Sequence, residues 1–230
     1  MQKLRIVPSV ALILLALTSC SPTWLGLDSG LFSGQPCKAP CWQNLTPGLS
    51  TDEAADRFVD DLGSEAWPGR YERVYDSGCR WMRASDKSEL GMTAIVDLYI
   101  EDGELAFVQS TPPLGPTLGQ VINHFGQPEY FKAVEAIGPD GKLDVLEIYY
   151  PVQGIAFQLH VKSEDAGRIK PKMRIIRIEY FPPGDLMTYL TARYSCRLGK
   201  ADAELAAKNE IANYIQPWSG YAEVTLITIP

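Results

Sequence analysis

The chain has 230 residues, 46% of them hydrophobic, which is enough to bury a core as one large domain or two small ones. It carries 28 Asp and Glu residues against 21 Lys and Arg, a formal net charge of −7. Because an acidic surface repels phosphate groups, this composition argues against nucleic acid and anionic lipid as partners.

The first 20 residues have the three parts of an export signal. Lys3 and Arg5 form a positive start, and Val7–Leu17 is an apolar stretch of about 11 residues, too short for a bilayer, which takes roughly 20. Leu17-Thr18-Ser19-Cys20 then resembles a bacterial lipobox. The resemblance implies cleavage before Cys20 and a diacylglycerol thioether on its sulfur. An ordinary secretory signal with a chance cysteine is the alternative.

A lipidated Cys20 predicts an extracytoplasmic protein whose contact with the membrane is its lipid anchor. Ser21 occupies the position where an Asp would favour an inner membrane, so we expect the outer membrane in a cell that has two. Loss of the signal peptide, residues 1–19, reduces Lys and Arg from 21 to 19 and makes the net charge about −9. Residues 20–40, where Ser, Gly and Pro are frequent, are expected to form a flexible tether.

Four further cysteines remain for disulfides. Cys37, Cys41, Cys79 and Cys196 are an even number in an exported chain, which predicts two bonds and allows three pairings. We favour a local Cys37–Cys41 loop with a long-range Cys79–Cys196 bond. The alternative joins Cys37 or Cys41 to Cys79.

Metal binding and catalysis have little support. Three residues separate Cys37 from Cys41, which excludes a redox CxxC motif, and no second close pair or nearby histidine completes a metal site. His124 and His160 are expected on a helix and on a sheet face. The sequence has no Gly-x-Ser-x-Gly elbow and no phosphate-binding glycine loop. We therefore predict no catalytic residue, cofactor or metal, although a pair of carboxylates acting as in a glycosidase stays open.

A first α/β unit is predicted over residues 41–113. Ser50 and Glu53 have the spacing of a capping box, and the helix that follows is expected to stop at Gly63. Asp102-Gly103 predicts a tight turn between antiparallel strands. The strands are expected within residues 71–84, 93–101 and 105–110, before Pro112-Pro113.

A second unit over residues 114–183 repeats this order. Thr117 is expected to cap a short helix ending at Gly126, followed by strands around residues 130–136, 143–150, 154–161 and 173–181 and then Pro182-Pro183. The matching order of elements indicates an internal duplication.

Residues 184–230 are expected to form a C-terminal helical extension, with helices at 185–193 and 202–214 and a last strand within 224–229. The fold class predicted is α+β, in which two tandem units of short helix plus antiparallel β meander form a sheet with helices on one face.

Strand alternation separates the two faces of this sheet. Residues such as Val96, Ile148 and Ile176 are expected to face the helices. The opposite face mixes aromatic and charged residues and is expected to be open to water, because the helices are placed on one side only. Our candidate binding residues on it are Tyr99, Tyr149, His160, Arg177 and Glu179. Cross-strand pairing that merely stabilises an exposed sheet is the alternative.

The two helical segments carry a family resemblance. Leu49–Gly63 and Leu114–Pro128 are capped short helices ending in Leu-Gly and Phe-Gly-Gln-Pro, each followed by a meander. In an exported chain this resembles the β-lactamase-inhibitor-protein-like superfamily and its single-unit SmpA/OmlA-type lipoproteins, although neither helix starts with the Gly-Met-Thr typical of that group. The resemblance covers residues 41–183 and implies protein binding by the open sheet face. Pro40-Cys41-Trp42 and Thr46-Pro47-Gly48 also look like segments of uncharacterised bacterial lipoproteins.

These observations favour a membrane-anchored, extracytoplasmic lipoprotein that acts as a non-catalytic protein-binding module of the cell envelope. Its expected partner is an envelope or secreted protein. A carrier of a small molecule or lipid, held between sheet and helices, is the alternative.

Overall fold

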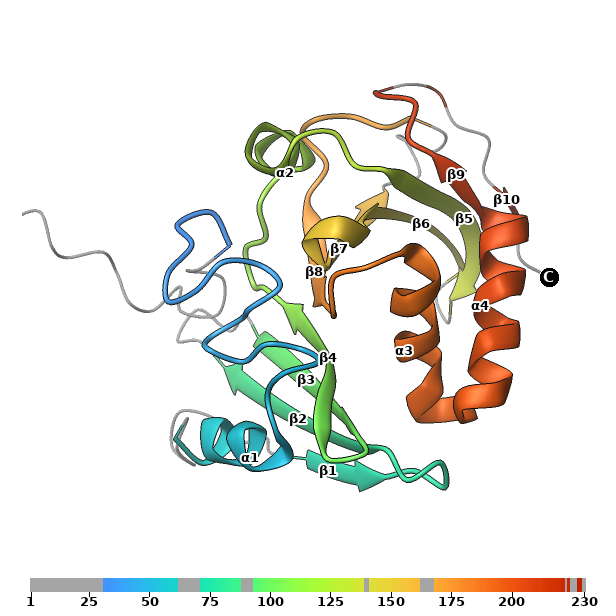
Figure 1. The fold of residues 1–230 in the computed structure, drawn as a ribbon. Coiled ribbons are helices and arrows are strands. Elements are labelled where there is room, and N and C mark those ends of the chain that lie inside the picture. The colour runs from blue at the N-terminus through green and yellow to red at the C-terminus, as the bar shows by residue number, and fades with distance from the viewer. Residues whose placement is uncertain are drawn as a thin grey trace, which may run out of the picture.

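The computed structural model describes residues 31–61, 71–87, 93–138, 141–161, 168–221, 223 and 227–228 (Figure 1). Cys20 and the predicted export signal lie outside these residues. The elements in chain order are α1 (Asp52–Asp61), β1 (Tyr71–Val74), β2 (Arg80–Lys87), β3 (Thr93–Glu101), β4 (Glu104–Thr111), α2 (Leu118–Phe125), β5 (Tyr130–Gly138), β6 (Gly141–Tyr150), the 3-10 helix η2 (Pro151–Gln153), β7 (Ile155–Val161), β8 (Ile175–Tyr180), α3 (Leu186–Leu198), α4 (Lys200–Tyr214), β9 (Ile215–Pro217) and β10 (Ile227–Thr228).

All the strands described belong to one sheet of order β1-β2-β3-β4-β8-β7-β6-β5-β10, with β9 also paired to β5. Neighbours are antiparallel except for β10, which runs parallel to β5. The predicted α+β class with an antiparallel sheet is therefore confirmed. Two four-stranded meanders meet where β4 pairs with β8 along Val108–Ser110.

Local sequence signals explain the turns and helix starts. Asp102 and Gly103 have φ values of 54° and 80°, so the predicted tight turn between β3 and β4 uses residue types that tolerate this conformation. Thr117 caps α2 as expected, in a capping box with Gln120. The expected Ser50 cap of α1 is wrong by one residue. The Ala54 amide donates to Thr51 Oγ1, whereas Ser50 Oγ accepts from the Thr46 amide.

The outer face of the sheet is the face covered by α1 and α2. Its core is mostly aliphatic and includes Val96, Leu98, Leu146, Ile148, Ile155 and Leu159 from the strands and Ala55, Val59, Leu118 and Val121 from the helices. This confirms most of the predicted core face. Ile176 is an exception with 38% exposure, because a bulge after Gln158 pairs Leu159 with Ile175 and puts Ile175 in the core.

Residues 31–50 also pack on the outer face, where Leu31, Trp42 and Leu45 belong to its core. The predicted flexible tether therefore does not hold for residues 31–40. Arg80 fixes α1 nearby, because its guanidinium contacts Asp52 and Asp56 on the helix and donates to Glu72 Oε1 on β1 at 2.7 Å.

Helices α3 and α4 cover part of the inner face of the sheet, so the prediction of helices on one face only is wrong. Figure 1 shows the sheet curving around α3. A second core cluster fills this side, with Tyr99, Phe107, Tyr149 and Phe181 from the sheet side and Leu186, Tyr189 and Leu190 from α3. Asp185 caps α3 by accepting from the Thr188 amide at 2.7 Å. The C-terminal region is thus part of the core rather than an extension.

Two disulfides join Cys37 to Cys41 and Cys79 to Cys196, which confirms the favoured pairing and excludes a bond to Cys79 from Cys37 or Cys41. The long-range bond ties α3 to the residue that precedes β2. Ser77 Oγ reinforces the same junction by donating to the Cys196 carbonyl at 2.7 Å.

We predict that the double variant Cys79→Ser/Cys196→Ser loses about 2–5 kcal/mol of unfolding free energy. The bond spans a sequence separation of 117, so it restricts the unfolded chain strongly. Urea denaturation under non-reducing conditions measures the loss.

The matched control is Cys37→Ser/Cys41→Ser, whose sequence separation is only 4. Its loss is expected to be roughly half as large, because the entropy of loop closure grows with loop length. An equal or larger loss in the control would contradict this account.

Candidate functional site on the inner face of the sheet

Three of the five predicted binding residues lie beneath α3. Tyr99, Tyr149 and Glu179 are 8%, 0% and 3% exposed, so the prediction that their face is open to water is wrong for them. The physical reason is Tyr189 of α3, whose ring centroid lies 5.8 Å from that of Tyr149. The Tyr189 hydroxyl donates to Glu179. These residues hold α3 on the sheet.

The polar side chains between the sheet and α3 and α4 form a buried charge cluster. Glu147 is at its centre, where Arg193 Nη1 and Nη2 donate to Oε2 and Oε1 at 3.1 and 2.9 Å and Tyr149 Oη donates to Oε2 at 2.6 Å. Lys132 Nζ donates to Glu210 Oε1 at 2.8 Å and lies 3.7 Å from Glu147 Oε2. The members of the buried charge cluster are Lys132, Glu147, Tyr149, Glu179, Tyr189, Arg193, Tyr194 and Glu210.

Electrostatics keeps Glu147 ionised. Burial alone would raise its pKa, but Arg193, Lys132 and the hydrogen bond from Tyr149 together hold the pKa well below the usual range. Burial raises the pKa of Tyr149 and Tyr189 far above their ordinary value, and the neighbouring carboxylates add to this. The pKa of Tyr99 rises to about 12, mainly through burial. Glu147 is therefore a fixed negative charge near neutral pH, and Tyr149 and Tyr189 keep their hydroxyl protons.

We predict that Glu147→Gln lowers the unfolding free energy at pH 7 by about 3 kcal/mol, because Arg193 loses its paired charge inside the core. Stability from a depressed carboxyl pKa exists above the unfolded-state pKa, about 4.3, and is lost as the pH falls below it. The wild type should therefore lose stability more steeply than the variant between pH 5 and pH 3. Denaturation curves across this range measure both effects.

Lys208→Met is the control, because Lys208 pairs with Glu204 on the exposed side of α4, with 66% and 61% exposure. Its expected effect is at most about 0.5 kcal/mol with an unchanged pH slope. Parallel pH profiles for the wild type and Glu147→Gln would refute the role given to Glu147.

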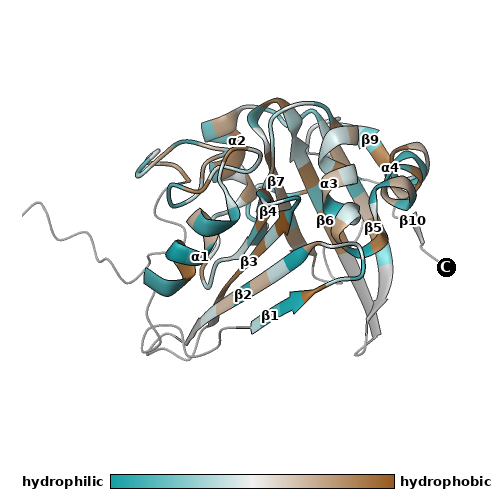
Figure 2. Cartoon of the chain, turned by 60° about the horizontal axis from the view of Figure 1, so that its bottom comes forward, coloured by the Kyte–Doolittle hydropathy of each residue, from teal (hydrophilic) through white to brown (hydrophobic). Residues whose placement is uncertain are grey.

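Part of the inner face extends beyond α3. In Figure 2 helices α3 and α4 lie to one side, and β1, β2 and β3 continue past them. Register places Tyr71, Arg83, Asp97 and Gln109 in one row across β1 to β4. Tyr71 is 55% exposed and the Arg83 side chain 41%. This uncovered surface remains available to a partner.

The buried carboxylate of Asp97 holds the neighbouring side chains of this row in place. It is fully buried, accepting from Arg83 Nε at 2.6 Å and Nη2 at 2.9 Å, and from Trp81 Nε1 and Gln109 Nε2 at 3.1 Å each. The hydrogen bond to Asp97 raises the pKa of Arg83. The Arg83 guanidinium lies 4.9 Å from the Trp81 ring centroid, and the Tyr71 and Trp81 rings are 5.3 Å apart. The exposed side chains are thus held in place by a satisfied buried carboxylate.

Arg177, a predicted site residue, lies on the next row, on β8. Its Nε and the Oε1 of its strand partner Gln158 are both buried without a hydrogen-bond partner within the described structure. His160 lies on β7 opposite Val145, and its side chain is outside what the structure describes. We define the arginine–aromatic strip as Tyr71, Arg73, Trp81, Arg83, Gln109 and Arg177.

Of this strip, only Arg177 was a sequence-based candidate. Trp81 and Arg83 could have been found from the run Arg80-Trp81-Met82-Arg83. Met82 is fully buried on the outer face, so its two neighbours must lie on the inner one. The pairing of Asp97 with Gln109 and Arg83 depends on the register between β2, β3 and β4, and no local sequence pattern predicts it.

Among the residues described, no group of three or more His, Cys, Asp or Glu is arranged to hold a metal ion. None of the helices in the described ranges has both the length and the apolar character needed to cross a membrane.

Comparison with known proteins yields no relative. No family model matches the chain, and neither the curated proteins nor the solved structures contain a match.

Proposed function

We propose that the protein is a lipid-anchored, extracytoplasmic module that binds a partner protein through the arginine–aromatic strip and has no catalytic role. The carrying observation is the strip itself, in which Tyr71 and Arg83 are exposed and Trp81 is half-buried, while Asp97 accepts hydrogen bonds from Trp81 and Arg83 and so orders them. Trp, Tyr and Arg dominate binding hot spots, and side chains already ordered lose little entropy on association.

The positive charge of the arginine–aromatic strip favours a partner protein whose contact surface is rich in carboxylates. Arg73, Arg83 and Arg177 are cationic. The two acids beside them on this face are already partnered, Asp97 with Arg83 and Glu179 with Tyr189. The strip is therefore positive on a chain whose net charge is −7. Complementary charge favours an envelope or secreted protein with Asp or Glu on its contact surface. Nucleic acid is a poor partner, because the net negative charge of the chain repels its phosphates.

The compartment is inferred from the cysteines. Two disulfides in the described residues favour an oxidising environment outside the cytoplasm. Cys20 supplies the membrane anchor in this proposal, in the outer membrane if the cell has two.

We further propose that residues 41–113 and 114–183 arose by tandem duplication. In the first unit the Asp52 amide at the start of α1 donates to the Gly103 carbonyl just before β4. In the second the Leu118 amide at the start of α2 donates to the Met173 carbonyl just before β8. Each helix start thus contacts the approach to the fourth strand of its own meander.

The glycines before the two helices support the same idea. A Cβ on Gly48 would lie 3.1 Å from Pro182 Cγ, and one on Gly115 would lie 3.3 Å from Pro112 Cγ. Each glycine therefore contacts the proline that closes the other unit, as a pseudo-twofold relation requires. A relationship to the β-lactamase-inhibitor-protein-like superfamily is part of this proposal.

The rival function, a carrier with its ligand between sheet and helices, has less support. The described side chains there pack in the two core clusters, one on each face of the sheet.

A photo-crosslinking residue at position 71 should trap one discrete partner in intact cells, because Tyr71 lies on the edge strand β1 and is 55% exposed. The same residue at Leu205, which is 60% exposed on α4, should not trap it. The double variant Arg73→Glu/Arg177→Glu should reduce the product from position 71 about tenfold, since two charges reverse at the contact. Immunoblots of the product measure the yield.

The variant Lys172→Glu/Lys208→Glu makes the same change in net charge at exposed sites away from the strip and should leave the yield unchanged. If the strip reversal left the same product at full yield, protein binding through the strip would be excluded.

For the anchor, Cys20→Ser should remove labelling by a clickable palmitate analogue and release the chain from the membrane fraction, because the acceptor sulfur is lost. Ser21→Ala is the neighbouring control and should be labelled like the wild type. A wild-type chain that takes up no label would show that Cys20 is not lipidated.

A further inference from the structure

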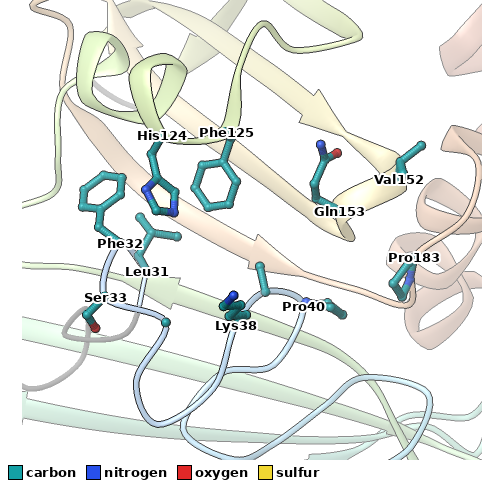
Figure 3. A pocket seen from close by; sticks show the side chains of 12 residues that line it. Leu31, Phe32, Ser33, Lys38, Pro40, His124, Phe125, Val152, Gln153 and Pro183 are labelled. Carbon is teal, nitrogen blue, oxygen red and sulfur yellow. The ribbon is translucent and has the colours of Figure 1, made fainter.

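A pocket of about 490 Å³ lies on the other side of the molecule from the strip, between α2, η2 and the segment 31–40 (Figure 3). Its volume is in the range of small-ligand sites. Four stretches of chain contribute to it: residues 31–40, the end of α2, η2 and Pro183. Nothing in the proposed protein-binding function uses it.

The lining is mostly apolar. Figure 3 shows His124 and Phe125 projecting from α2 toward the segment that carries Leu31 and Phe32. The Phe32 and His124 rings pack edge to face with centroids 5.2 Å apart, and Ala39, Pro40, Val152 and Pro183 complete the apolar part. Such walls favour an apolar group by removing it from water.

The polar groups of the pocket favour an anion. Lys38 lines the pocket, and the twelve lining residues include no Asp or Glu. A positive rim on a chain of net charge −7 sets this pocket apart from the average surface.

The pocket wall is preorganised, because covalent and steric constraints fix its position. The Cys37–Cys41 disulfide closes the loop that carries Lys38, Ala39 and Pro40. Gly154, at φ 66°, brings η2 against this loop, because a Cβ there would lie 2.8 Å from Pro40 Cβ and 2.4 Å from the Phe181 carbonyl oxygen. A site formed by such constraints loses little entropy when it is filled.

We propose that this pocket binds a small apolar carboxylic acid. Its apolar group occupies the hollow beside Phe125, and its carboxylate pairs with Lys38. This site is separate from the arginine–aromatic strip, and ligand binding here does not depend on protein binding there.

N-acetyl-leucine is the test probe, because it is water-soluble and does not partition into the detergent that keeps the purified full chain in solution. Calorimetric titration should show binding, with N-acetyl-leucinamide about tenfold weaker because it lacks the charge that Lys38 recognises. Lys38→Met should abolish this difference between the two probes. Val152→Trp, at an exposed rim position, should fill the pocket and remove binding of both.

Lys208→Met serves as the matched control and should bind both probes like the wild type. The proposal is overturned if the wild type binds neither probe, if it binds acid and amide equally, or if Val152→Trp binds like the wild type. Because Lys38 and Val152 lie outside the strip, their variants should retain the crosslink from position 71, which separates failure of this site from failure of the protein-binding function.

Discussion

The salt bridge between Glu147 and Arg193 is the interaction on which the arrangement of the molecule depends. A buried ion pair adds little stability compared with apolar packing, but displacing either partner is costly, so it specifies one position for α3. From that position α3 contacts both meanders. It reaches the first through Cys196 and through Ser195 Oγ, which donates to Glu101 at 2.8 Å, and the second through Glu147 and Glu179. The curved sheet is therefore clamped across its seam, where β4 and β8 pair only along Val108–Ser110.

This clamp decides which surfaces are left for recognition. Helix α3 covers Tyr99 and Tyr149. The part of the inner face that stays accessible is therefore the arginine–aromatic strip, which runs from β1 to β8 beside the helix. The outer face is closed by α1, α2 and residues 31–50, and its hollow is the pocket lined by Lys38 and Gln153. A protein partner and a small ligand would therefore meet the molecule on opposite sides, with the sheet between them.

Sequence patterns predicted what local physics determines. Alternation identified Val96, Leu98 and Ile148 as core, and the residue types of Asp102-Gly103 identified a turn. The cysteine count predicted two disulfides and left three pairings, of which the favoured one is present. Alternation distinguishes two faces, but it does not tell whether one of them is solvated. Glu147 and Glu179 therefore looked like surface residues, because their partner Arg193 is distant in sequence and its contact depends on how α3 docks. Ile176 was misplaced because a single bulge reverses which residue points inward.

The position of α3 in the chain also constrains how the protein is made. The aromatic residues of the inner face belong to strands completed by residue 181, whereas the helix that covers them begins only at Leu186. During synthesis this face stays uncovered, and Cys79 stays without Cys196, until the chain has been extended past Leu198. Docking of α3 thus acts as a completion step, and a chain cut short before α3 would expose an apolar surface and an unpaired Cys79 thiol.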